Sequence, residues 1–480
     1  MTRLARAWHV LVALPALAGC GELSSSLDTV AAVAFSLDTA RLFLGSTLQL
    51  EAHALDAAGD TVADAEMHWS SNNPQVVLVS PDGVARAVGV GKTSITAESG
   101  GRSAAIPTEV TARFVTVSAG LAHTCAVTDQ GYTACWGSNS WGRLGSELAF
   151  SSTFPVLAEG AGSGAATAYA GGFHSCALLA GGAAFCWGAN WAGQLGAGTS
   201  DGLRHAAPAS VLGGVSWTAF SLGDSHTCAL SDDQRIYCWG NNDFGQLGPG
   251  GSTEFCSSAQ VECSTAPREV APGLRFTAVS AGRVHTCGIT TEGDALCWGG
   301  NIAGQLGHGT DTSATNPTPV TGGLKFESIS SSPLHTCGLT MDGEAYCWGL
   351  NSRGQLGDGS TTRASAPVPV TGGLRFTTLA TGGAHTCALD AQGAAYCWGA
   401  NLNGQLGSAQ PDVSTVPLAV ATSLRFRTIS AGEAHTCGLS TDDVLYCWGL
   451  NFDGQVGAGL SGDGLTRSIR QPTRVLGQPD

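Results

Sequence analysis

Short runs in which apolar and polar residues alternate recur along most of the chain, and this period of two is the pattern of half-buried β-strands. Residues 47–52 (Thr-Leu-Gln-Leu-Glu-Ala) and residues 93–97 (Thr-Ser-Ile-Thr-Ala) are clear examples. Turn-forming residues separate such runs, as in Ala-Gly-Asp at 58–60 and Pro-Asp-Gly at 81–83. The pattern predicts an all-β protein built from short strands and tight turns.

One longer pattern returns seven times between residues 123 and 457, at intervals of 50 to 52 residues with a single interval of 59. Each copy reads His-x-Cys, nine further residues, Cys-Trp-Gly, an Asn, and then Gly-Gln-Leu-Gly or a close variant. In the sixth copy the predicted strands are residues 368–370, 376–379, 386–389 and 394–398. Four strands in each of seven repeats predict a seven-bladed β-propeller over residues 113–480.

The repeated motifs Gly-Gln-Leu-Gly, Trp-Gly-x-Asn and Ala-Gly-x-x-His resemble, in order and spacing, those of the regulator of chromosome condensation (RCC1) repeat family. The resemblance covers residues 113–480 and implies a propeller fold, not an activity. The chain ends on a Pro-x-x-Val segment at residues 472–475, whereas the first repeat begins at Phe114 without such a segment before it. We therefore expect the C-terminal strand to complete the first blade and close the ring.

Residues 30–112 precede the repeats and carry their own alternating pattern. They resemble the bacterial Ig-like domain of the group-2 type at residues 45–47, 69–74, 84–88 and 91–93. The resemblance implies an N-terminal Ig-like β-sandwich in front of the propeller. Such domains in surface proteins are usually spacers and sometimes adhesins, so both roles stay open here.

The first residues have the character of an export signal. Residues 1–19 combine Arg3 and Arg6 with an apolar core that is too short to span a bilayer. Their end and the next residue read Leu-Ala-Gly-Cys at 17–20. This sequence resembles the lipobox of bacterial lipoproteins and implies a lipid on Cys20. Gly21 follows, not the aspartate that favours inner-membrane retention, so an outer-membrane lipoprotein is predicted, tethered by residues 20–29. An ordinary cleavable signal is the alternative, and the side of the membrane stays open.

Cysteine use points to an oxidising compartment, because 16 of the 17 cysteines occur in pairs at short, regular spacing. If the hairpin turn of each repeat centres on the residue equivalent to Gln392, the two repeat cysteines face each other across adjacent strands. The predicted disulfide pairs are Cys125 with Cys135, Cys176 with Cys186, Cys228 with Cys238, Cys256 with Cys263, Cys287 with Cys297, Cys337 with Cys347, Cys387 with Cys397, and Cys437 with Cys447. A zinc site made from the His and the two Cys of a repeat is the alternative, but it lacks a fourth ligand. We therefore expect no metal and no cofactor, with the repeated His and Trp residues in the core.

The charge of the chain excludes several classes of partner. With a net charge of −15 and only 12% charged residues, it is a poor match for a phosphate backbone, and no basic run suggests binding to anionic lipid. Nucleotide exchange and chromatin binding, which belong to nuclear members of the resembled family, are not expected. Neither a nucleophile elbow nor a phosphate loop is present, so we predict a protein that is not an enzyme. A propeller-based hydrolase or lyase would become the better interpretation if polar residues lined the central channel.

Two positions between the Asn and the Gly-Gln-Leu-Gly turn vary from copy to copy, and six copies place a large apolar residue there. These candidate partner-binding residues are Trp141, Trp191, Phe244, Ile302, Leu402 and Phe452. Because equivalent loops of a propeller fall on one face, an exposed ring of such side chains would form a surface for a protein, or for a glycan. The alternative is that they pack between blades, which would favour a structural or adhesive role. The loops at 249–267 and 458–471 are further candidates, and we expect a monomer.

Overall fold

The computed structural model describes residues 29–148, 150–250, 254–256, 261–459 and 467–479. The predicted signal, Cys20 and most of the predicted tether lie outside this part of the chain. Between residues 29 and 112 the strands are β1 (Ala32–Phe35), β2 (Ala40–Phe43), β3 (Thr47–Gln49), β4 (Ala52–Leu55), β5 (His68–Ser71), β6 (Val77–Val79), β7 (Val84–Ala87), β8 (Gly91–Ser99) and β9 (Arg102–Thr111). They form sheets in the orders β2-β9-β8-β5, β3-β7-β6 and β1-β4.

From Phe114 onward the described chain forms seven antiparallel sheets in succession. The first three contain β10 (Phe114–Ala119), β11 (His123–Thr128), β12 (Thr133–Ser138) and β13 (Ser151–Leu157); β14 (Ala165–Ala170), β15 (His174–Leu179), β16 (Ala184–Ala189) and β17 (Arg204–Ser210); and β18 (Trp217–Leu222), β19 (His226–Ser231), β20 (Ile236–Asn241), β22 (Val261–Glu269) and β21 (Glu254–Cys256). A short 3-10 helix, η1 (Ser140–Gly142), follows β12.

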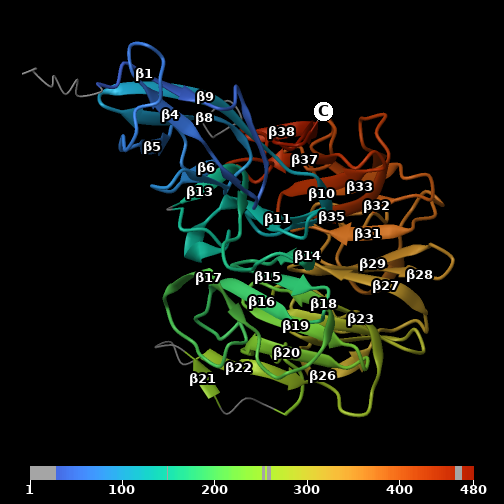
Figure 1. The fold of residues 1–480 in the computed structure, drawn as a ribbon. Coiled ribbons are helices and arrows are strands. Elements are labelled where there is room, and N and C mark those ends of the chain that lie inside the picture. The colour runs from blue at the N-terminus through green and yellow to red at the C-terminus, as the bar shows by residue number, and fades with distance from the viewer. Residues whose placement is uncertain (1–28, 149, 251–253, 257–260, 460–466, 480) are drawn as a thin grey trace, which may run out of the picture.

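The other four sheets repeat the four-stranded order. They contain β23 (Phe276–Ala281), β24 (His285–Thr290), β25 (Ala295–Gly299) and β26 (Ala314–Pro319); β27 (Phe326–Ser331), β28 (His335–Thr340), β29 (Ala345–Gly349) and β30 (Ala364–Pro369); β31 (Thr378–Thr381), β32 (His385–Leu389), β33 (Ala395–Ala400) and β34 (Val413–Ala419); and β35 (Phe426–Ala431), β36 (His435–Ser440), β37 (Leu445–Leu450) and β38 (Ser468–Arg474). The first strand of every sheet lines a central cavity, and the last sheet returns to contact the first (Figure 1).

The fourth strand of each sheet was assigned wrongly from the sequence. Residues 368–370 were expected in the same sheet as 376–398, but β30 pairs with β29 of the preceding sheet, and β34 fills the fourth place beside β33. The chain leaves the third strand, makes the Gly-Gln-Leu-Gly turn and returns along that same strand. Pairing with the nearest strand closes the shorter loop, and sequential strands usually pair in this way.

The expected closure by strand exchange is therefore also wrong. β38 pairs with β37 of the seventh sheet, while the first sheet obtains its fourth strand from β13. The first and seventh sheets meet through side chains and turns instead. For example, the Thr124 hydroxyl and the Trp136 indole both donate to the main-chain oxygen of Gln455, each over 2.9 Å.

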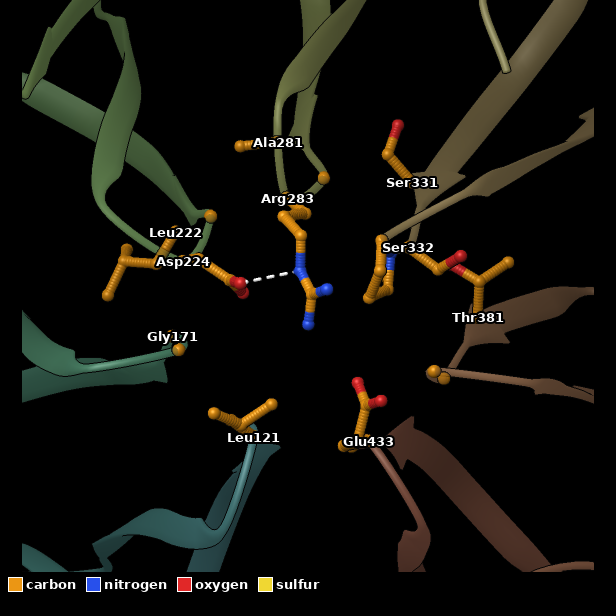
Figure 2. A pocket seen from close by; sticks show the side chains of 18 of the residues that line it. Leu121, Gly171, Leu222, Asp224, Ala281, Arg283, Ser331, Ser332, Thr381 and Glu433 are labelled. Carbon is orange, nitrogen blue, oxygen red and sulfur yellow. Dashed lines mark hydrogen bonds and ion pairs between the residues drawn. The ribbon is translucent and has the colours of Figure 1, made fainter. Parts of the chain in front are cut away.

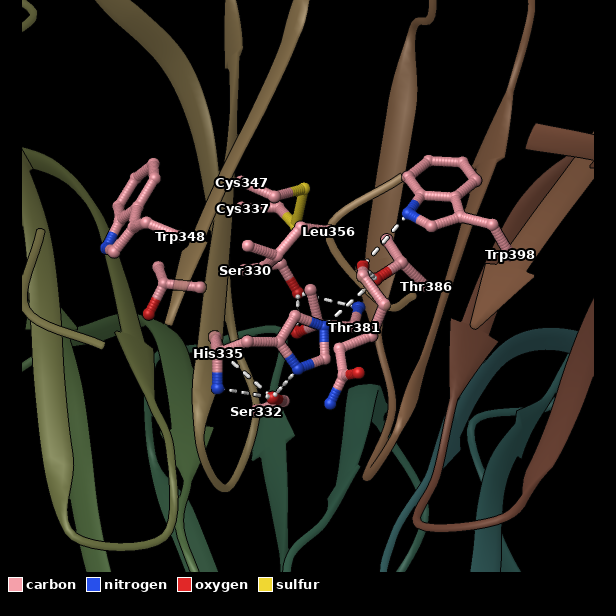
Figure 3. The surroundings of a disulfide bond; sticks show 12 residues. Ser330, Ser332, His335, Cys337, Cys347, Trp348, Leu356, Thr381, Thr386 and Trp398 are labelled. Carbon is pink, nitrogen blue, oxygen red and sulfur yellow. Dashed lines mark hydrogen bonds between the residues drawn. A yellow bond between two sulfur atoms is a disulfide. The ribbon is translucent and has the colours of Figure 1, made fainter. Parts of the chain in front are cut away.

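The same bonds recur at every junction between neighbouring sheets, and Figure 3 shows one of them. The hydroxyl of Thr386 and the indole N–H of Trp398 both donate to the main-chain oxygen of Gln355 in the preceding sheet, over 2.9 Å each. Because that hydroxyl donates to the carbonyl, it accepts from the protonated Nε2 of His335, 2.9 Å away. The repeated His and Trp residues are all fully buried, which confirms their predicted place in the core.

All eight predicted cysteine pairs are disulfide-bonded. The bonds join Cys125 to Cys135, Cys176 to Cys186, Cys228 to Cys238, Cys256 to Cys263, Cys287 to Cys297, Cys337 to Cys347, Cys387 to Cys397, and Cys437 to Cys447. Cys387 and Cys397 face each other in the β32–β33 register with their Cα atoms 4.1 Å apart. The turn that sets this register is held by Asp390, whose carboxylate accepts the main-chain N–H groups of Gln392 and Ala394. Since the sulfur atoms are bonded to each other, the zinc alternative loses its thiolate ligands.

Candidate functional site

The loop between the third and fourth strands is a rigid platform for the variable residues. In the sixth sheet, the buried Asn401 side chain accepts the N–H of Leu406 over 3.0 Å and donates to the main-chain oxygens of Ser408 and Pro411. The side chain of Gln405 accepts the N–H of Asn403 over 3.0 Å. The repeated Asn and Gln therefore face inward, and of the two variable residues between them in this sheet Leu402 is exposed and Asn403 is half-buried.

Five of the six candidate partner-binding residues are exposed, so they do not pack between the sheets. The exposed fractions are 39% for Trp141, 48% for Phe244, 71% for Ile302, 53% for Leu402 and 56% for Phe452. Trp191 is half-buried. We refer to these six residues as the apolar ring. Leaving such side chains in water is unfavourable, so an exposed group of them around one face is a feature that calls for an explanation.

Three aromatic rings join the apolar ring to the centre of the molecule. Trp141 packs edge-to-face on Trp191, and Trp191 packs in the same way on Phe173, each with 5.1 Å between ring centroids. Trp141 holds a left-handed backbone conformation (φ 65°), which is unfavourable for a bulky residue. Arg143 lies over the Phe173 ring at 5.8 Å and donates to the main-chain oxygen of Gly172. The contacts between the first and second sheets therefore hold these aromatic side chains in place.

The apolar ring surrounds the mouth of the central channel on the same face. The third strand of each sheet ends beside the turn that joins the first two strands; in the sixth sheet the N–H of Ala400 donates to the oxygen of Ala384 over 2.8 Å. The seven turns of this kind enclose a cavity of about 120 Å³. The first residue after the Gly or Ser of each turn lines it, and in chain order these are Leu121, Gly172, Asp224, Arg283, Pro333, Gly383 and Glu433.

Three charged side chains gather in this opening (Figure 2). Arg283 reaches toward the middle, its Nε donates to Asp224 over 2.7 Å, and Glu433 approaches from across the opening. Burial raises the pKa of Glu433, an effect that Arg283 opposes and Asp224 reinforces. Burial also raises the pKa of Asp224, against the influence of Arg283. The sequence interpretation missed this cluster, although the variable residues between Gly and His in the repeat were a signal for it.

One serine and one histidine also meet at the opening. Ser332 takes the place that Gly has in the other sheets, and its Oγ lies 2.7 Å from Nδ1 of His335 (Figure 3). Since Nε2 of this ring carries the proton, Nδ1 is an acceptor, and the single proton of the serine hydroxyl has two acceptors within reach, Nδ1 and the main-chain oxygen of His335 at 2.9 Å. Burial lowers the pKa of His335 to about 3, so the imidazole is too weak a base to activate an alcohol near neutral pH. The pair acts as a structural bond, and Asp224 and Arg283 beside it form an ion pair.

The two long candidate loops are only partly within the described residues. In the first, Cys256 and Cys263 join β21 to β22, so this insertion adds a fifth strand to the outer edge of the third sheet. Phe255 on β21 is 61% exposed. Residues 460–466 of the second loop lie outside the described part. Within the described residues, no helix is both long enough and apolar enough to cross a membrane.

Comparison with known proteins identifies relatives of the repeats. The chain is 34% identical to the ultraviolet-B receptor UVR8 of Arabidopsis thaliana over 198 residues, which are 41% of this chain and 43% of that protein. It is 32% identical to the E3 ubiquitin-protein ligase HERC2 of Homo sapiens over 242 residues, 48% of this chain and 5% of that protein. The matched region thus spans less than half of either relative.

Solved structures show the same fold at low identity. Prp20p from Saccharomyces cerevisiae matches with a TM-score of 0.60 at 20% identity, over 69% of this chain and 84% of that one. Human WBSCR16 matches with a TM-score of 0.62 at 20% identity, over 71% and 93%. These neighbours assign an RCC1-like propeller fold to the repeated sheets.

Family models cover more than half of the chain. The regulator of chromosome condensation (RCC1) repeat matches residues 181–230, 233–289, 292–339, 342–389 and 392–439. A second model of the same repeat matches residues 217–246, 276–305, 326–355, 376–405 and 426–455. Their boundaries fall within the third to seventh sheets and part of the second. The chain belongs to the RCC1 repeat family.

Proposed function

We propose that this protein is an exported, lipid-anchored component of the cell envelope that presents a seven-bladed RCC1-like propeller as a protein-binding module. The apolar ring is the binding surface. The exposure of five of its six residues on one face, around a charged opening, is the observation that carries the proposal. Among the relatives, yeast Prp20p has been studied for its binding to Gsp1p and histones, which supports protein binding by this fold.

The location of the protein follows from its leader and its cysteines. Residues 1–19 and Cys20 supply export and lipid attachment in the proposal, with the outer membrane as the destination. The eight disulfides support an oxidising compartment, because the cytosol keeps thiols reduced. Residues 30–112 form an Ig-like domain in this scheme, and the protein acts as a monomer.

The surface chemistry favours a protein partner over a nucleic acid. Large aromatic and aliphatic side chains dominate binding energies between proteins, and the ring offers both kinds. A phosphate backbone would meet an acidic molecule with a net charge of −15.

Partner capture with matched variants tests the proposal. Soluble protein carrying Cys20→Ser is passed over envelope and culture extracts, next to a face variant with Phe244, Leu402 and Phe452 changed to Ala. A control variant changes Leu212, Leu274 and Met341, which are also exposed but lie at the opposite end of the sheets.

We expect one protein to be held by the parent and by the control variant, and released by the face variant. If the face variant retains that protein, the apolar ring is not the binding surface. If only glycan or whole cells are retained by all three, an adhesive role through other surfaces replaces the proposal. Labelling of intact and permeabilised cells separately determines which side of the outer membrane the protein faces.

A further inference from the structure

The N-terminal strands β1–β9 lie against the place where the ring of sheets closes (Figure 1). One hydrophobic cluster contains buried residues from three parts of the chain: Leu44 and Val90 from the segment that carries β1–β9, Phe114 and Trp136 from the first sheet, and Leu439, Leu445 and Val475 from the seventh sheet and the segment after it. A flexible spacer would have its own separate core. Here the N-terminal strands share one core with both ends of the ring.

Main-chain hydrogen bonds extend this contact to both sides of the closure. The N–H of Val90 donates to the oxygen of Pro155 over 3.0 Å, and the N–H of Leu157 donates to the oxygen of Val88 over 2.7 Å. Together they pair the N-terminal strands with the outer edge of the first sheet. After β9, the N–H of Ala112 donates over 2.7 Å to the oxygen of Gly477, beyond the last strand of the seventh sheet.

The fit is close enough to require glycine at two positions. A Cβ at Gly477 would lie 2.2 Å from the Cβ of Val90, and a Cβ at Gly45 would lie 2.7 Å from the ring of Tyr132. Both glycines also have positive φ angles, 76° and 87°, which other residues rarely adopt. The N-terminal strands are therefore docked in a defined position.

The first sheet departs from the repeat where it meets these strands. Tyr132, Phe154 and Leu157 are apolar and large, whereas the second sheet has Ala183, Ala207 and Ser210 at the equivalent places. Leu157 is only 6% exposed, although it lies on the outermost strand of its sheet. The large residues at these positions pack against the N-terminal strands that cover them.

In the part of the chain that the structure describes, this contact falls on the junction between sheets that are not consecutive in sequence. Every other pair of neighbouring sheets is connected by a short linker, but the first and seventh sheets come from opposite ends of the repeated region in the sequence. Their contacts join residues far apart in sequence, such as Thr124 with His435 and Ala119 with Ser430. Among the described residues, the two sheets share no strand and no linker joins them, so every strand pair would stay intact if this junction, the seam, opened.

We propose that the N-terminal strands are a clasp that holds the seam closed, beyond any role as a spacer. The clasp binds the edge of the first sheet and the end of the seventh, so opening the seam requires one of the two contacts to break. It acts on the same ring that carries Phe452 and Trp141 on either side of the seam. This inference concerns closure of the ring and stands whether or not the apolar ring binds a partner.

Hydrogen exchange measured by mass spectrometry tests the clasp in the whole protein. The double variant Tyr132→Ala with Leu157→Ser gives the first sheet the residues that the second sheet already has. We expect exchange in β11–β12 and β36–β37 to become about tenfold faster or more, while exchange in β23–β25, across the ring, stays unchanged. Faster exchange confined to β1–β9, with the seam unchanged, would overturn the proposal.

A matched control removes similar atoms away from the seam. Tyr396→Ala with Leu418→Ser truncates a tyrosine and a leucine of the sixth sheet, which is expected to speed exchange there and not in β11–β12. If the double variant at the seam does not fold, Tyr132→Ala alone gives the same contrast. If that variant changes the exchange rate at the seam and in β23–β25 by the same factor relative to the parent, the N-terminal strands do not act on closure.

Discussion

Nε2 of His335 lies 2.9 Å from the hydroxyl oxygen of Thr386 in the next sheet, and that hydroxyl donates in turn to the main-chain oxygen of Gln355. The hydroxyl is an acceptor and a donor at once, with all three groups buried. The same relation occurs at all seven junctions, with Ser175 in place of Thr in the second sheet. Each sheet is thus attached to its neighbour by a polar bridge inside an apolar core.

Removing the Thr386 hydroxyl is expected to lower the free energy of unfolding, because the buried His335 N–H then loses its acceptor. Thr386→Val keeps the shape of the side chain but leaves the His335 N–H without its acceptor, so it should lower the free energy of unfolding by about 2–3 kcal/mol. Thr386→Ser keeps the hydroxyl, as Ser175 does, and should cost less than about 1 kcal/mol. Urea denaturation of both variants measures the difference. Equal losses would mean that packing of the methyl group, not the hydrogen bond, dominates.

The buried histidines predict that the protein loses stability in mild acid. Burial lowers the pKa of His335 and His385 to about 3 and that of His226 and His435 to about 4, against about 6.5 when unfolded. The unfolded chain therefore binds more protons between these limits. Stability is therefore greatest above pH 6.5 and is lost as the pH falls toward 4 for His226 and His435 and toward 3 for His335 and His385. Each histidine should contribute up to about 1.4 kcal/mol per pH unit in that window.

Denaturant midpoints between pH 7.5 and 4.5 provide the measurement. A steep loss below pH 6 is expected, and it should become less steep in a His385→Gln variant that still folds. A flat profile over this range would mean that the imidazoles are not held neutral in the native state.

The last glycine of the Gly-Gln-Leu-Gly turn has no room for a side chain, because a tryptophan of the next sheet packs against it. A Cβ at Gly357 would lie 2.7 Å from Nε1 of Trp398, and the residue has a φ of 69°. We expect Gly357→Ala to lower the free energy of unfolding by about 2–4 kcal/mol, from backbone strain and overpacking together. Gly373→Ala is the control, because its φ is 65° but nothing lies within 4 Å. Thermal unfolding should show a much smaller loss of stability for Gly373→Ala than for Gly357→Ala. Similar losses in the two variants would mean that backbone strain, and not the contact with Trp398, accounts for the effect.

Much of the fold follows from the sequence because the repeat determines it locally. The spacing of Cys387 and Cys397 around a turn at Gln392 sets the register of a hairpin, and the disulfides follow from that register. The buried positions of Trp398 and His385 follow from their identity in all copies. Short-range geometry of this kind needs no knowledge of the neighbouring sheets.

The features that could not be predicted depend on contacts between distant segments. The sequence pattern of residues 368–370 does not say which of two neighbouring sheets they join, and the path of the connecting turn places β30 beside β29. The ion pair of Asp224 and Arg283 becomes visible only when seven turns are brought together around one opening. The large residues Tyr132 and Leu157 are unremarkable as a pattern until the N-terminal strands cover them.

The disulfide of a repeat and the disulfide of the insertion should differ in how much each contributes to the free energy of unfolding. Replacing Cys387 and Cys397 together by Ala is expected to lower the free energy of unfolding by about 2–3 kcal/mol, because the bond closes a short loop in the unfolded chain. Cys256 and Cys263 lie at the outer edge of the third sheet, so their removal should affect the insertion more than global unfolding. Calorimetry under oxidising conditions measures both. A larger global loss from removing Cys256 and Cys263 would contradict this assignment.

Arg143 occupies the position at which the six other sheets have Gln, and it is 4% exposed. Burial lowers its pKa to about 10 although Asp453 partly opposes this, and its Nε has no hydrogen-bond partner among the described residues. Elsewhere the Gln side chain accepts a loop N–H, as Gln194 does from Ala192 over 2.9 Å. We expect Arg143→Gln to be neutral or to stabilise by about 1 kcal/mol, because a buried charge is exchanged for the usual amide.

Arg143→Ala supplies the contrast, since it removes the bond to Gly172 and leaves a cavity beneath Phe173. Chemical denaturation should rank the proteins as Arg143→Gln at or above the parent and Arg143→Ala below both. The near-ultraviolet circular dichroism of Trp141 and Trp191 should change in both variants if Arg143 positions the aromatic rings. If Arg143→Gln is instead strongly destabilised and loses the captured partner, the buried guanidinium is required to shape the apolar ring.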